Sequence, residues 1–240
     1  MKKIAENIIE VRKAKKVYRI GSTSLNALNG VDLTIEEGEF CCIVGRSGSG
    51  KSTLLNLLAG LEPPTSGEVI IAGKHIERMT EGELILFRQK NIGFVFQSFN
   101  LLQSLTALEN TALPLEFRGI SKGKREKAAA EMLKAVGIGT HMKHRPNQMS
   151  GGQQQRVGLA RALVTKPKII FADEPTGNLD SKTSDDMMAL ITGIMRERNQ
   201  TFVMVTHDPN MASYADKVVH ILDGEIIQID YRSKEGEVQS

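Results

Sequence analysis

The sequence predicts an α/β fold built around a largely parallel sheet. Three observations lead to this prediction: short runs that are apolar at every position, helical patterns that alternate with them, and turn-forming residues between the two. Continuous apolarity over so short a run is typical of a central strand covered on both faces, which is the environment of a parallel sheet. Alternation of such strands with helices indicates an α/β core.

The elements are expected in a definite order along the chain. Two β-rich segments open it, at 8–14 and 31–35, and apolar strands follow at 40–44, 69–72, 92–96, 169–172, 202–205 and 218–222. Helical patterns occupy 52–59 and 185–198.

The stretch from about 101 to 163 differs, because its pattern is helical, most clearly at 124–136, and contains no convincing strand. We interpret this stretch as a helical insertion at about 101–163, while the length of 240 residues allows one large domain or two small ones. Residues 231–240 are polar and aperiodic and are predicted to form a frayed tail.

Composition and charge disfavour several classes of protein. The net charge is +3 with both signs interspersed, so the sequence lacks the electrostatic footprint of a nucleic-acid binder, and we expect no nucleic-acid partner. Cys41 and Cys42 are neighbours in an apolar run and are expected to be reduced, buried thiols. The N-terminus does not resemble a secretory signal. No window approaches the roughly 18 apolar residues needed to span a bilayer, so we expect any membrane role to depend on a partner.

Residues 45–52 read GRSGSGKS and fit the phosphate-loop pattern G-x-x-x-x-G-K-[ST], directly after the apolar strand at 40–44 and before a predicted helix. Glycines let backbone N–H groups converge on phosphate oxygens, and the helix N-terminus adds partial positive charge. Lys51 is expected to reach the β- and γ-phosphates, and Ser52 to bind Mg²⁺. The alternative is a chance glycine-rich turn, which the flanking strand and helix disfavour. The predicted nucleotide-binding residues here are Gly45, Arg46, Ser47, Gly48, Ser49, Gly50, Lys51, Ser52 and Thr53.

A second site is predicted where the apolar run IIFADE, 169–174, ends in two acids. Ligands of α/β folds collect at the carboxyl ends of strands. Asp173 is expected to hold Mg²⁺, directly or through water, while Glu174 polarises an attacking water. The alternative is a strand end with solvated acids, which the presence of the phosphate loop disfavours.

Between these two motifs, residues 149–156 read MSGGQQQR and match the LSGGQ signature of ATP-binding-cassette (ABC) ATPases, with Met149 in place of Leu. With all three motifs in register, the chain resembles this superfamily over essentially 8–230. The resemblance implies a single nucleotide-binding domain over 1–230 with the ABC ATPase fold. That fold has a RecA-like mixed sheet core, an N-terminal antiparallel β subdomain and an α-helical subdomain, at about 101–163, inserted in the core. It also implies an enzyme that hydrolyses ATP with water to ADP and phosphate.

The lesser motifs of the family also appear in order. Gln97 after FVF resembles the Q-loop glutamine, and residues 177–180, GNLD, resemble the D-loop, which ends in Asp180. His207 after VMVT resembles the switch histidine, and Tyr18 resembles the aromatic residue that stacks on adenine. By this resemblance Gln97 is a catalytic residue that also contributes to the Mg²⁺ site, and Asp180 contributes to the ATP site.

The family mechanism implies a dimer. Two subunits face head to tail, and each ATP lies between the phosphate loop of one copy and the signature of the other. Ser150, Gly151 and Gly152, followed by Gln153, stand where a helix would begin, so they can offer N–H groups and a hydroxyl to the γ-phosphate of the partner copy. In this mechanism Glu174 orients the attacking water, and His207 steadies the γ-phosphate.

The connecting sequence indicates a subgroup. Residues 93–115 and 172–183 are similar to the ATPases that serve macrolide-exporter (MacB) and lipoprotein-release (LolD) permeases, with the FtsE type as the division relative; Gln103 stands where relatives commonly carry Pro. This implies a membrane permease that docks near Gln97 to Leu115 and holds the chain at the cytoplasmic face of the cell membrane. Two alternatives stay open. One is a mechanical or regulatory ATPase of the division type. The other is a soluble cassette of translation or repair, although the chain has neither a second cassette nor a coiled-coil insertion.

Overall fold

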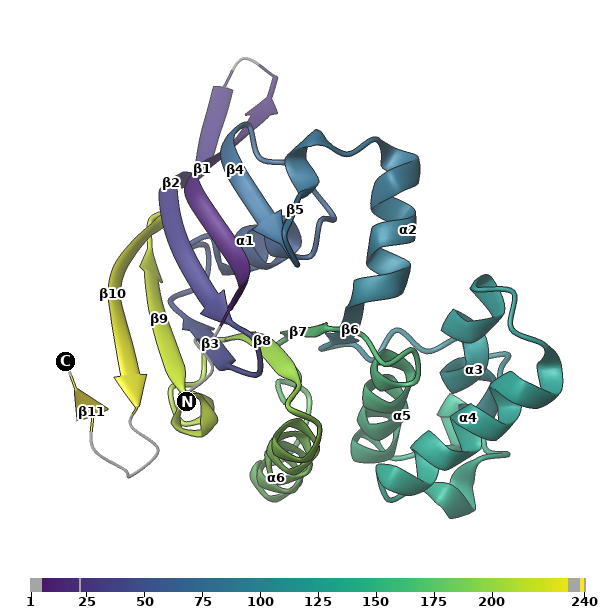
Figure 1. Ribbon diagram of the computed structural model, residues 1–240. Coiled ribbons are helices and arrows are strands. Elements are labelled where there is room, and N and C mark those ends of the chain that lie inside the picture. The colour runs from purple at the N-terminus through teal and green to yellow at the C-terminus, as the bar shows by residue number, and fades with distance from the viewer. Residues whose placement is uncertain (1–5, 22, 233–237, 240) are drawn as a thin grey trace, which may run out of the picture. The chain divides into compact units, whose positions relative to one another are not determined.

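The computed structural model describes residues 6–21, 23–232 and 238–239, which form two compact units (Figure 1). The first unit contains the described residues up to Leu86 and from Met195 onward. The second contains Phe87–Ile194. The two boundaries fall inside helices α2 (Glu81–Asn91) and α6 (Ser181–Arg198).

An antiparallel sheet occupies the N-terminal part of the first unit. Strands β1 (Asn7–Ile20) and β2 (Thr23–Glu36) form a long hairpin, and β4 (Ser66–Ile71) and β5 (Lys74–His75) extend it in the order β2-β1-β4-β5. The 3₁₀ helix η1 (Ile76–Arg78) follows β5. The hairpin is longer than the two short segments predicted, because its outer end is polar and pairs through backbone hydrogen bonds that leave no apolar pattern.

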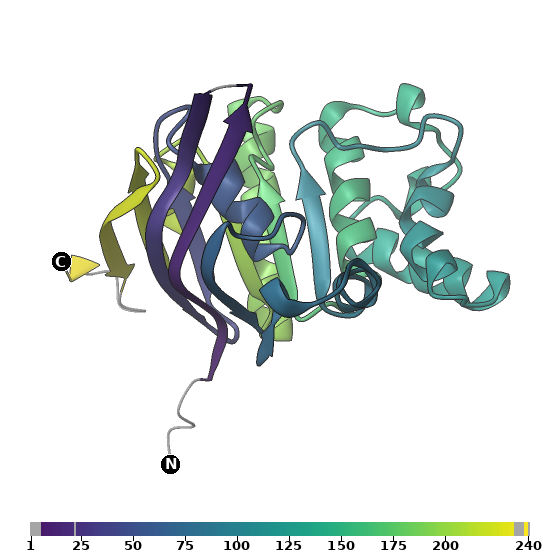
Figure 2. The same ribbon diagram turned by 90° about the horizontal axis from the view of Figure 1, so that it is seen from above.

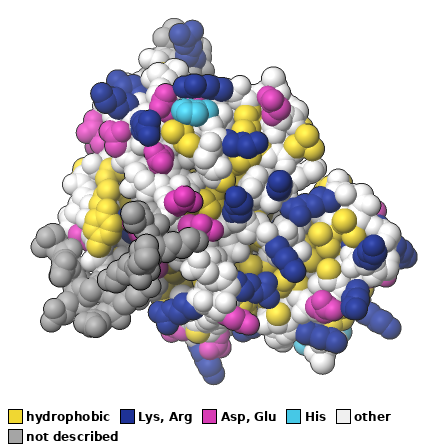
Figure 3. Space-filling model, in the orientation of Figure 1, with side chains coloured by type: hydrophobic (Ala, Val, Ile, Leu, Met, Phe, Trp, Pro, Cys, Tyr) yellow, Lys and Arg dark blue, Asp and Glu magenta, His cyan; other side chains and the backbone are white. Residues whose placement is uncertain are grey.

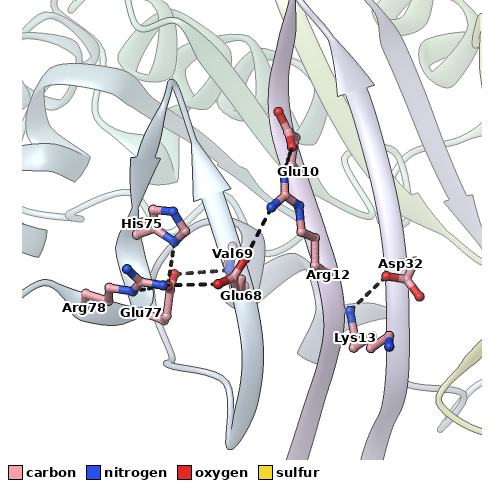
Figure 4. A network of polar contacts seen from close by, with 9 residues as sticks. All are labelled: Glu10, Arg12, Lys13, Asp32, Glu68, Val69, His75, Glu77 and Arg78. Carbon is pink, nitrogen blue, oxygen red and sulfur yellow. Dashed lines mark hydrogen bonds and ion pairs between the residues drawn. The ribbon is translucent and has the colours of Figure 1, made fainter.

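A chain of ion pairs crosses this sheet and the turn after it (Figure 4). Glu68 of β4 lies 3.5 Å from the Arg12 guanidinium and 3.1 Å from that of Arg78. Glu77 lies 3.2 Å from Nε of Arg78 and 2.8 Å from Nδ1 of His75. Because the arginine side chains are 59% and 64% exposed, solvent screens these pairs and each contributes little to stability.

The second sheet of this unit is mixed. Strand β3 (Phe40–Val44) lies between β8 (Thr201–Thr206) and β9 (Lys217–Leu222) and is parallel to both. Strands β10 (Glu225–Arg232) and β11 (Val238–Gln239) continue from β9 with antiparallel pairing. All residues of β3 are buried, as its continuous apolarity predicts.

The two cysteines of β3 are free thiols with no exposed surface, which confirms their predicted burial. Burial raises the pKa of Cys42 to about 12 and raises that of Cys41 well above its ordinary value.

The tail predicted at 231–240 begins inside β10. Tyr231 pairs with Lys217 of β9 and with Gln239 of β11, and its ring centroid lies 5.1 Å from the Lys217 ammonium. The predicted boundary at 230 therefore falls within a strand, because aromatic packing on a lysine continues the pairing beyond the last apolar residue. Residues 233–237 and 240 of the predicted tail lie outside the described residues.

Helix α1 (Lys51–Leu58) contacts both sheets of the first unit, β8 in one and β2 and β4 in the other. Leu54, Leu55, Leu57 and Leu58 have no exposed surface. These four leucines form a broad apolar face of the helix, and its position against two sheets buries that face. The 3₁₀ helix η4 (Met211–Tyr214) packs against β3.

Helices dominate the second unit. Helices α3 (Ala107–Phe117), α4 (Lys122–Ala135) and α5 (Gly151–Leu163) contact one another and lie side by side in Figures 1 and 2. The 3₁₀ helices η2 (Gly139–His141) and η3 (Pro146–Gln148) connect α4 to α5. No strand lies between 101 and 163, where every residue is described, so the predicted helical character is confirmed.

The two strands of this unit are β6 (Ile92–Phe96) and β7 (Ile169–Asp173), which pair in parallel, with α5 packed on β6. Helix α6 begins four residues before the predicted start, because the side chain of Asp180 accepts a hydrogen bond from the backbone N–H of Thr183 (3.0 Å) and caps the helix.

Charged side chains of both signs are interspersed on the face of the molecule shown in Figure 3. Among the described residues, the longest helices are too short or too polar to cross a lipid bilayer.

Candidate functional site

The loop between β3 and α1 depends on two glycines. A Cβ atom at Gly45 would lie 2.4 Å from the carbonyl oxygen of Ile221. Gly50 has φ 101° at the N-cap of α1, and a Cβ there would lie 2.6 Å from the carbonyl oxygen of Ala27. Neither position accepts a side chain, so the backbone of the loop is held closely against neighbouring strands.

Lys51 is the first residue of α1 and its side chain bends back into this loop. The residue is 7% exposed, and its ammonium donates hydrogen bonds to the carbonyl oxygens of Gly45 and Arg46, each at 2.8 Å. Ser52 is exposed and Thr53 half-buried in the same first turn, whose N–H groups lack intrahelical partners. An ammonium, two hydroxyls and a helix N-terminus together form a site for an anion.

His207 lies beside this loop in the first unit. Strands β3 and β8 are parallel, and Val44 pairs with Thr206. Gly45 and His207 are the next residues of the two chains, so they leave adjacent strands at the same level. The carboxyl ends of parallel strands are where α/β folds bind ligands.

Tyr18 lies on β1 with its orientation fixed by hydrogen bonding. Its hydroxyl donates to Oε2 of Glu62 at 2.7 Å, and the Lys16 ammonium lies 3.2 Å from the same oxygen and 5.2 Å from the ring centroid. Burial, and after it the hydrogen bond to Glu62, raises the pKa of Tyr18, so the phenol stays protonated. The ring is half-buried, which leaves part of it open for stacking.

In the second unit, Gln97 and Glu174 occupy corresponding positions. Phe96 pairs with Asp173 in the parallel ladder of β6 and β7, and Gln97 and Glu174 follow them. Asp173 and Glu174 are half-buried. Glu174 has φ 43°, a left-handed conformation that costs a non-glycine residue about 1 kcal/mol or more and recurs at active sites.

The segment after Glu174 is tied to the segment after Gln97. The side-chain amide of Asn178 donates to the carbonyl oxygen of Gln97 at 2.9 Å. A Cβ at Gly177 would lie 2.7 Å from Nε2 of Gln97. The predicted D-loop and Q-loop are therefore in contact within this unit.

The signature residues begin α5. Ser150 is the N-cap: its Oγ accepts from the N–H of Gln153 at 3.3 Å, and its own N–H donates to Oε1 of Gln153 at 2.9 Å, which forms a capping box. Gly151 and Gly152 occupy the first two helical positions, whose N–H groups have no intrahelical acceptor. The predicted helix start at Ser150 is confirmed. A Cβ at Gly152 would lie 2.6 Å from Cγ2 of Thr183, so the signature packs closely on the start of α6.

Asp180, predicted to contact ATP, caps α6. Its carboxylate accepts from the Thr183 hydroxyl at 2.6 Å as well as from the Thr183 N–H, and the hydroxyl contact in particular lowers the pKa of Asp180. Asp180 is exposed, so its carboxylate can accept a hydrogen bond from a further donor.

Two residues that the sequence did not single out support these loops. Arg161 of α5 donates to the carbonyl oxygens of Asn100 (2.6 Å) and Phe99 (2.8 Å), two residues with left-handed backbone just after Gln97. Gln155 is fully buried, and its amide donates to the carbonyl oxygen of Pro175 at 2.6 Å. No local signal identifies either, because one helical arginine or one glutamine of three resembles a surface residue until its partner is known.

The predicted site residues thus form two groups, one in each unit. The first unit brings the phosphate loop and His207 to neighbouring strand ends and carries Tyr18 on β1. The second unit joins Gln97, Glu174 and the D-loop, and carries the signature beside α6. Each group offers anion-binding N–H groups or oxygen ligands suited to a hard cation.

Comparison with known proteins gives consistent matches. The family model described as ABC transporter matches residues 28–177. The chain is 44% identical over 221 residues to the lipoprotein-releasing system ATP-binding protein LolD of Geobacter metallireducens, covering 92% of this chain and 98% of that protein. It is 46% identical over 228 residues to the macrolide export ATP-binding/permease protein MacB of Chlorobaculum tepidum, which covers 95% of this chain but 34% of that longer protein. A solved dimeric post-hydrolysis structure of an ATP-binding cassette bound to ADP and Pi superposes with a TM-score of 0.87 at 44% identity, covering 94% of this chain and 99% of that one.

Proposed function

Since the chain belongs to the ABC transporter family, we propose that it is the ATP-hydrolysing subunit that energises a separately encoded membrane permease. Membership confirms the predicted ABC ATPase fold and the prediction that the chain is an ATPase. The subgroup resemblance is confirmed as well, because relatives named LolD and MacB align over nearly the whole chain.

The observation that carries the proposal is the conformation of the phosphate loop. Gly45 and Gly50 lie against neighbouring backbone, and the Lys51 ammonium is enclosed by the loop carbonyls at 2.8 Å. A polyphosphate oxygen is a stronger acceptor for an ammonium than a neutral carbonyl, because the hydrogen bond is then charge-assisted on both sides. Lys51 therefore exchanges its loop carbonyls for the β- and γ-phosphates of ATP.

Divalent metal chemistry fits the predicted ligands. Ser52, Gln97 and Asp173 offer hydroxyl, amide and carboxylate oxygens, the donors that Mg²⁺ prefers, and the ion would neutralise charge on the β- and γ-phosphate oxygens. Glu174, in a left-handed conformation directly after β7, orients the attacking water and accepts its proton. His207 donates a hydrogen bond to the γ-phosphate.

The active species is a head-to-tail dimer of two copies, each closing the ATP site of the other. Ser150, Gly151 and Gly152 supply a hydroxyl and two N–H groups that have no intrahelical acceptor, and these bind the γ-phosphate held by the partner copy. Asp180 lies beside them through Thr183, at the same interface. The similar cassette solved as a dimer with ADP and Pi supports this arrangement.

The membrane partner docks on the second unit near Gln97 to Leu115. A mostly apolar cavity of about 220 Å³ borders this segment. It is lined by residues of β6, α3 and α5 that include Phe94, Phe96 and Phe117, and Pro114 lines it from the segment itself. The macrolide-export relative carries a permease in its own chain, which supports a permease partner for this one. The chain would then lie at the cytoplasmic face of the membrane, attached through that partner, and drive export or lipoprotein release.

Phosphate release from ATP by the purified chain, measured over a range of protein concentrations with Mg²⁺, tests the proposal. If two copies form each active site, specific activity rises with protein concentration and then reaches a plateau. A specific activity that is constant down to the lowest measurable concentration contradicts the shared site. No phosphate release at any concentration contradicts catalysis by the isolated chain.

A further inference from the structure

We infer that His141 is a positioning residue that holds Ser150 in place for the γ-phosphate of the partner copy, acting through the side chain of Gln153. The inference rests on the proposed function, because it assumes that Ser150 contacts that phosphate. His141 ends η2 in the second unit, and Gln153 lies in the first turn of α5 in the same unit.

The orientation of the Gln153 amide follows from the backbone. The N–H of Ser150 donates to one end of this amide at 2.9 Å, and only oxygen can accept there. The other end is therefore the NH₂ group, which lies 3.2 Å from Nε2 of His141. An amide nitrogen donates and does not accept, so Nε2 of His141 is the unprotonated acceptor.

The other ring nitrogen of His141 completes the arrangement. Nδ1 lies 3.0 Å from Oγ1 of Thr140, so the proton of the neutral ring is on Nδ1 and is donated to that hydroxyl. The His144 ring packs beside it with centroids 5.1 Å apart, and the N–H of His144 donates to the carbonyl oxygen of His141 at 3.0 Å. The imidazole is thus held at both nitrogens, with the tilted His144 ring beside it.

Gln153 transmits this position to Ser150 by two contacts. Its Oε1 accepts from the Ser150 N–H, and its own N–H donates to Ser150 Oγ at 3.3 Å. Oγ is used as an acceptor, so the hydroxyl proton of the exposed serine remains available to donate outward. Without an acceptor at His141, the Gln153 amide has one fixed end instead of two and regains rotamer freedom, which loosens the N-cap.

If the contact between His141 and Gln153 were purely structural, its loss would affect the stability of η2 and α5 but not recognition of the γ-phosphate. The two roles are separated by measuring ATP-driven dimerisation, ATP binding and thermal unfolding on the same variants. The measurements use the full chain carrying Glu174→Gln, so that hydrolysis does not deplete the dimer.

His141→Gln and His141→Phe form the matched pair. A glutamine places an amide oxygen near the position of Nε2, whereas phenylalanine keeps a ring of similar shape without an acceptor. We expect His141→Phe to raise the dissociation constant of the ATP-bound dimer about three- to tenfold, the effect of one lost hydrogen bond, and His141→Gln to stay within about twofold of the parent. ATP affinity of dilute monomer is expected to be unchanged in both.

A second pair of variants tests the route through Gln153. In a chain carrying Gln153→Met, the amide that links His141 to Ser150 is missing, so adding His141→Phe is expected to cause no further weakening. If His141→Phe weakens the ATP-bound dimer by a further threefold or more, about the effect of one hydrogen bond, in the chain that carries Gln153→Met, His141 acts by another route. If His141→Phe does not fold, His141→Asn replaces it, since its shorter amide reaches the Thr140 side but not Gln153.

The outcomes separate the inference from the proposed function. Failure of the Glu174→Gln chain to dimerise with ATP would overturn the proposed dimer and the inference with it. If the Glu174→Gln chain dimerises with ATP and adding His141→Phe leaves the dissociation constant of the dimer unchanged, only the inference is overturned. Equal weakening by His141→Phe and His141→Gln, together with a lowered unfolding temperature, would assign His141 a structural role only.

Discussion

The side-chain amide of Asn178 donates a hydrogen bond to the backbone carbonyl oxygen of Gln97 at 2.9 Å. One residue belongs to the predicted D-loop and the other to the predicted Q-loop, and Gly177 packs against the same glutamine. The contact joins the segment that follows Glu174, the proposed catalytic carboxylate, to the segment proposed to meet the permease. A displacement of either loop therefore acts directly on the other.

Lys51→Ala is expected to weaken ATP binding about 100-fold, because the ammonium makes charge-assisted hydrogen bonds to the β- and γ-phosphates worth roughly 1.5–3 kcal/mol each. Titration with labelled ATP measures the loss. Lys122→Ala, at an exposed position on α4, is the control and should bind ATP normally. Unchanged affinity in Lys51→Ala would show that residues 45–52 are not the nucleotide site.

Tyr18→Ala is expected to weaken the binding of ATP and the binding of GTP to a similar extent, by about tenfold. The reason is that stacking on a purine does not depend on the exocyclic groups of the base. Tyr18→Phe keeps the ring and loses only the hydrogen bond to Glu62, so it should retain most of the affinity. Competition binding with both nucleotides provides the measurement. If alanine leaves both affinities intact, Tyr18 serves to anchor β1 to Glu62 and does not stack on the base.

Gly152→Ala is expected to lower ATP turnover about tenfold while sparing ATP binding by the monomer, because its Cβ would lie 2.6 Å from Cγ2 of Thr183 and displace the signature. Adding Thr183→Ser removes that methyl group and keeps a hydroxyl for Asp180, so turnover should recover. Phosphate release by the single and double variants decides between steric and other causes. A double variant as slow as the single one would contradict the steric explanation.

Glu174→Gln keeps the shape of the side chain and removes the carboxylate that orients water. Turnover is expected to fall by at least about 100-fold, since general-base catalysis contributes roughly 10²–10⁴, while ATP binding persists. The variant with ATP should accumulate as a dimer on gel filtration, because the bridging γ-phosphates are not cleaved. Turnover within a few fold of the unmodified chain would remove Glu174 from the catalytic residues.

Lys217→Met is expected to destabilise the first unit by about 3 kcal/mol, because it leaves the Glu39 carboxylate, whose side chain is only 12% exposed, without its cation. The Lys217 side chain is 3% exposed, and its ammonium lies 2.8 Å from Glu39 and donates to the Thr34 carbonyl oxygen. Arg12→Met, which removes the exposed pairs of Figure 4, should cost less than about 1 kcal/mol. Urea unfolding measures the stability of both variants. Equal unfolding midpoints would contradict the prediction that Lys217→Met is the more destabilising change.

Elements with a strong local pattern were predictable from the sequence. The apolar runs at 40–44 and 169–172 are strands, and Ser150 begins a helix through a capping box that its spacing to Gln153 allows. Among the elements that escaped prediction are β10 and α2. Strand β10 is only partly buried along its length, and α2 carries neighbouring apolar residues with no clear helical stripe.

The residues of the candidate site also fall into two classes, those with a local sequence signal and those without one. The motifs of this site are local in sequence, so Lys51, Glu174 and the signature could be proposed as site residues without a structure. The residues that hold them could not be, because Arg161 reaches Phe99 and Asn100 across about 60 residues of sequence, a separation for which a single sequence carries no signal.

The burial of both cysteines in β3 makes the native chain suitable for site-specific spectroscopic labelling. A maleimide reacts with thiolate that solvent can reach, and Cys41 and Cys42 offer neither exposed sulfur nor, with raised pKa values, an appreciable thiolate fraction at neutral pH. A single cysteine introduced at an exposed position of the D-loop or of the signature helix would then carry a fluorophore or spin label alone. The opening and closing of two copies could be followed by distance measurements without first removing the natural thiols.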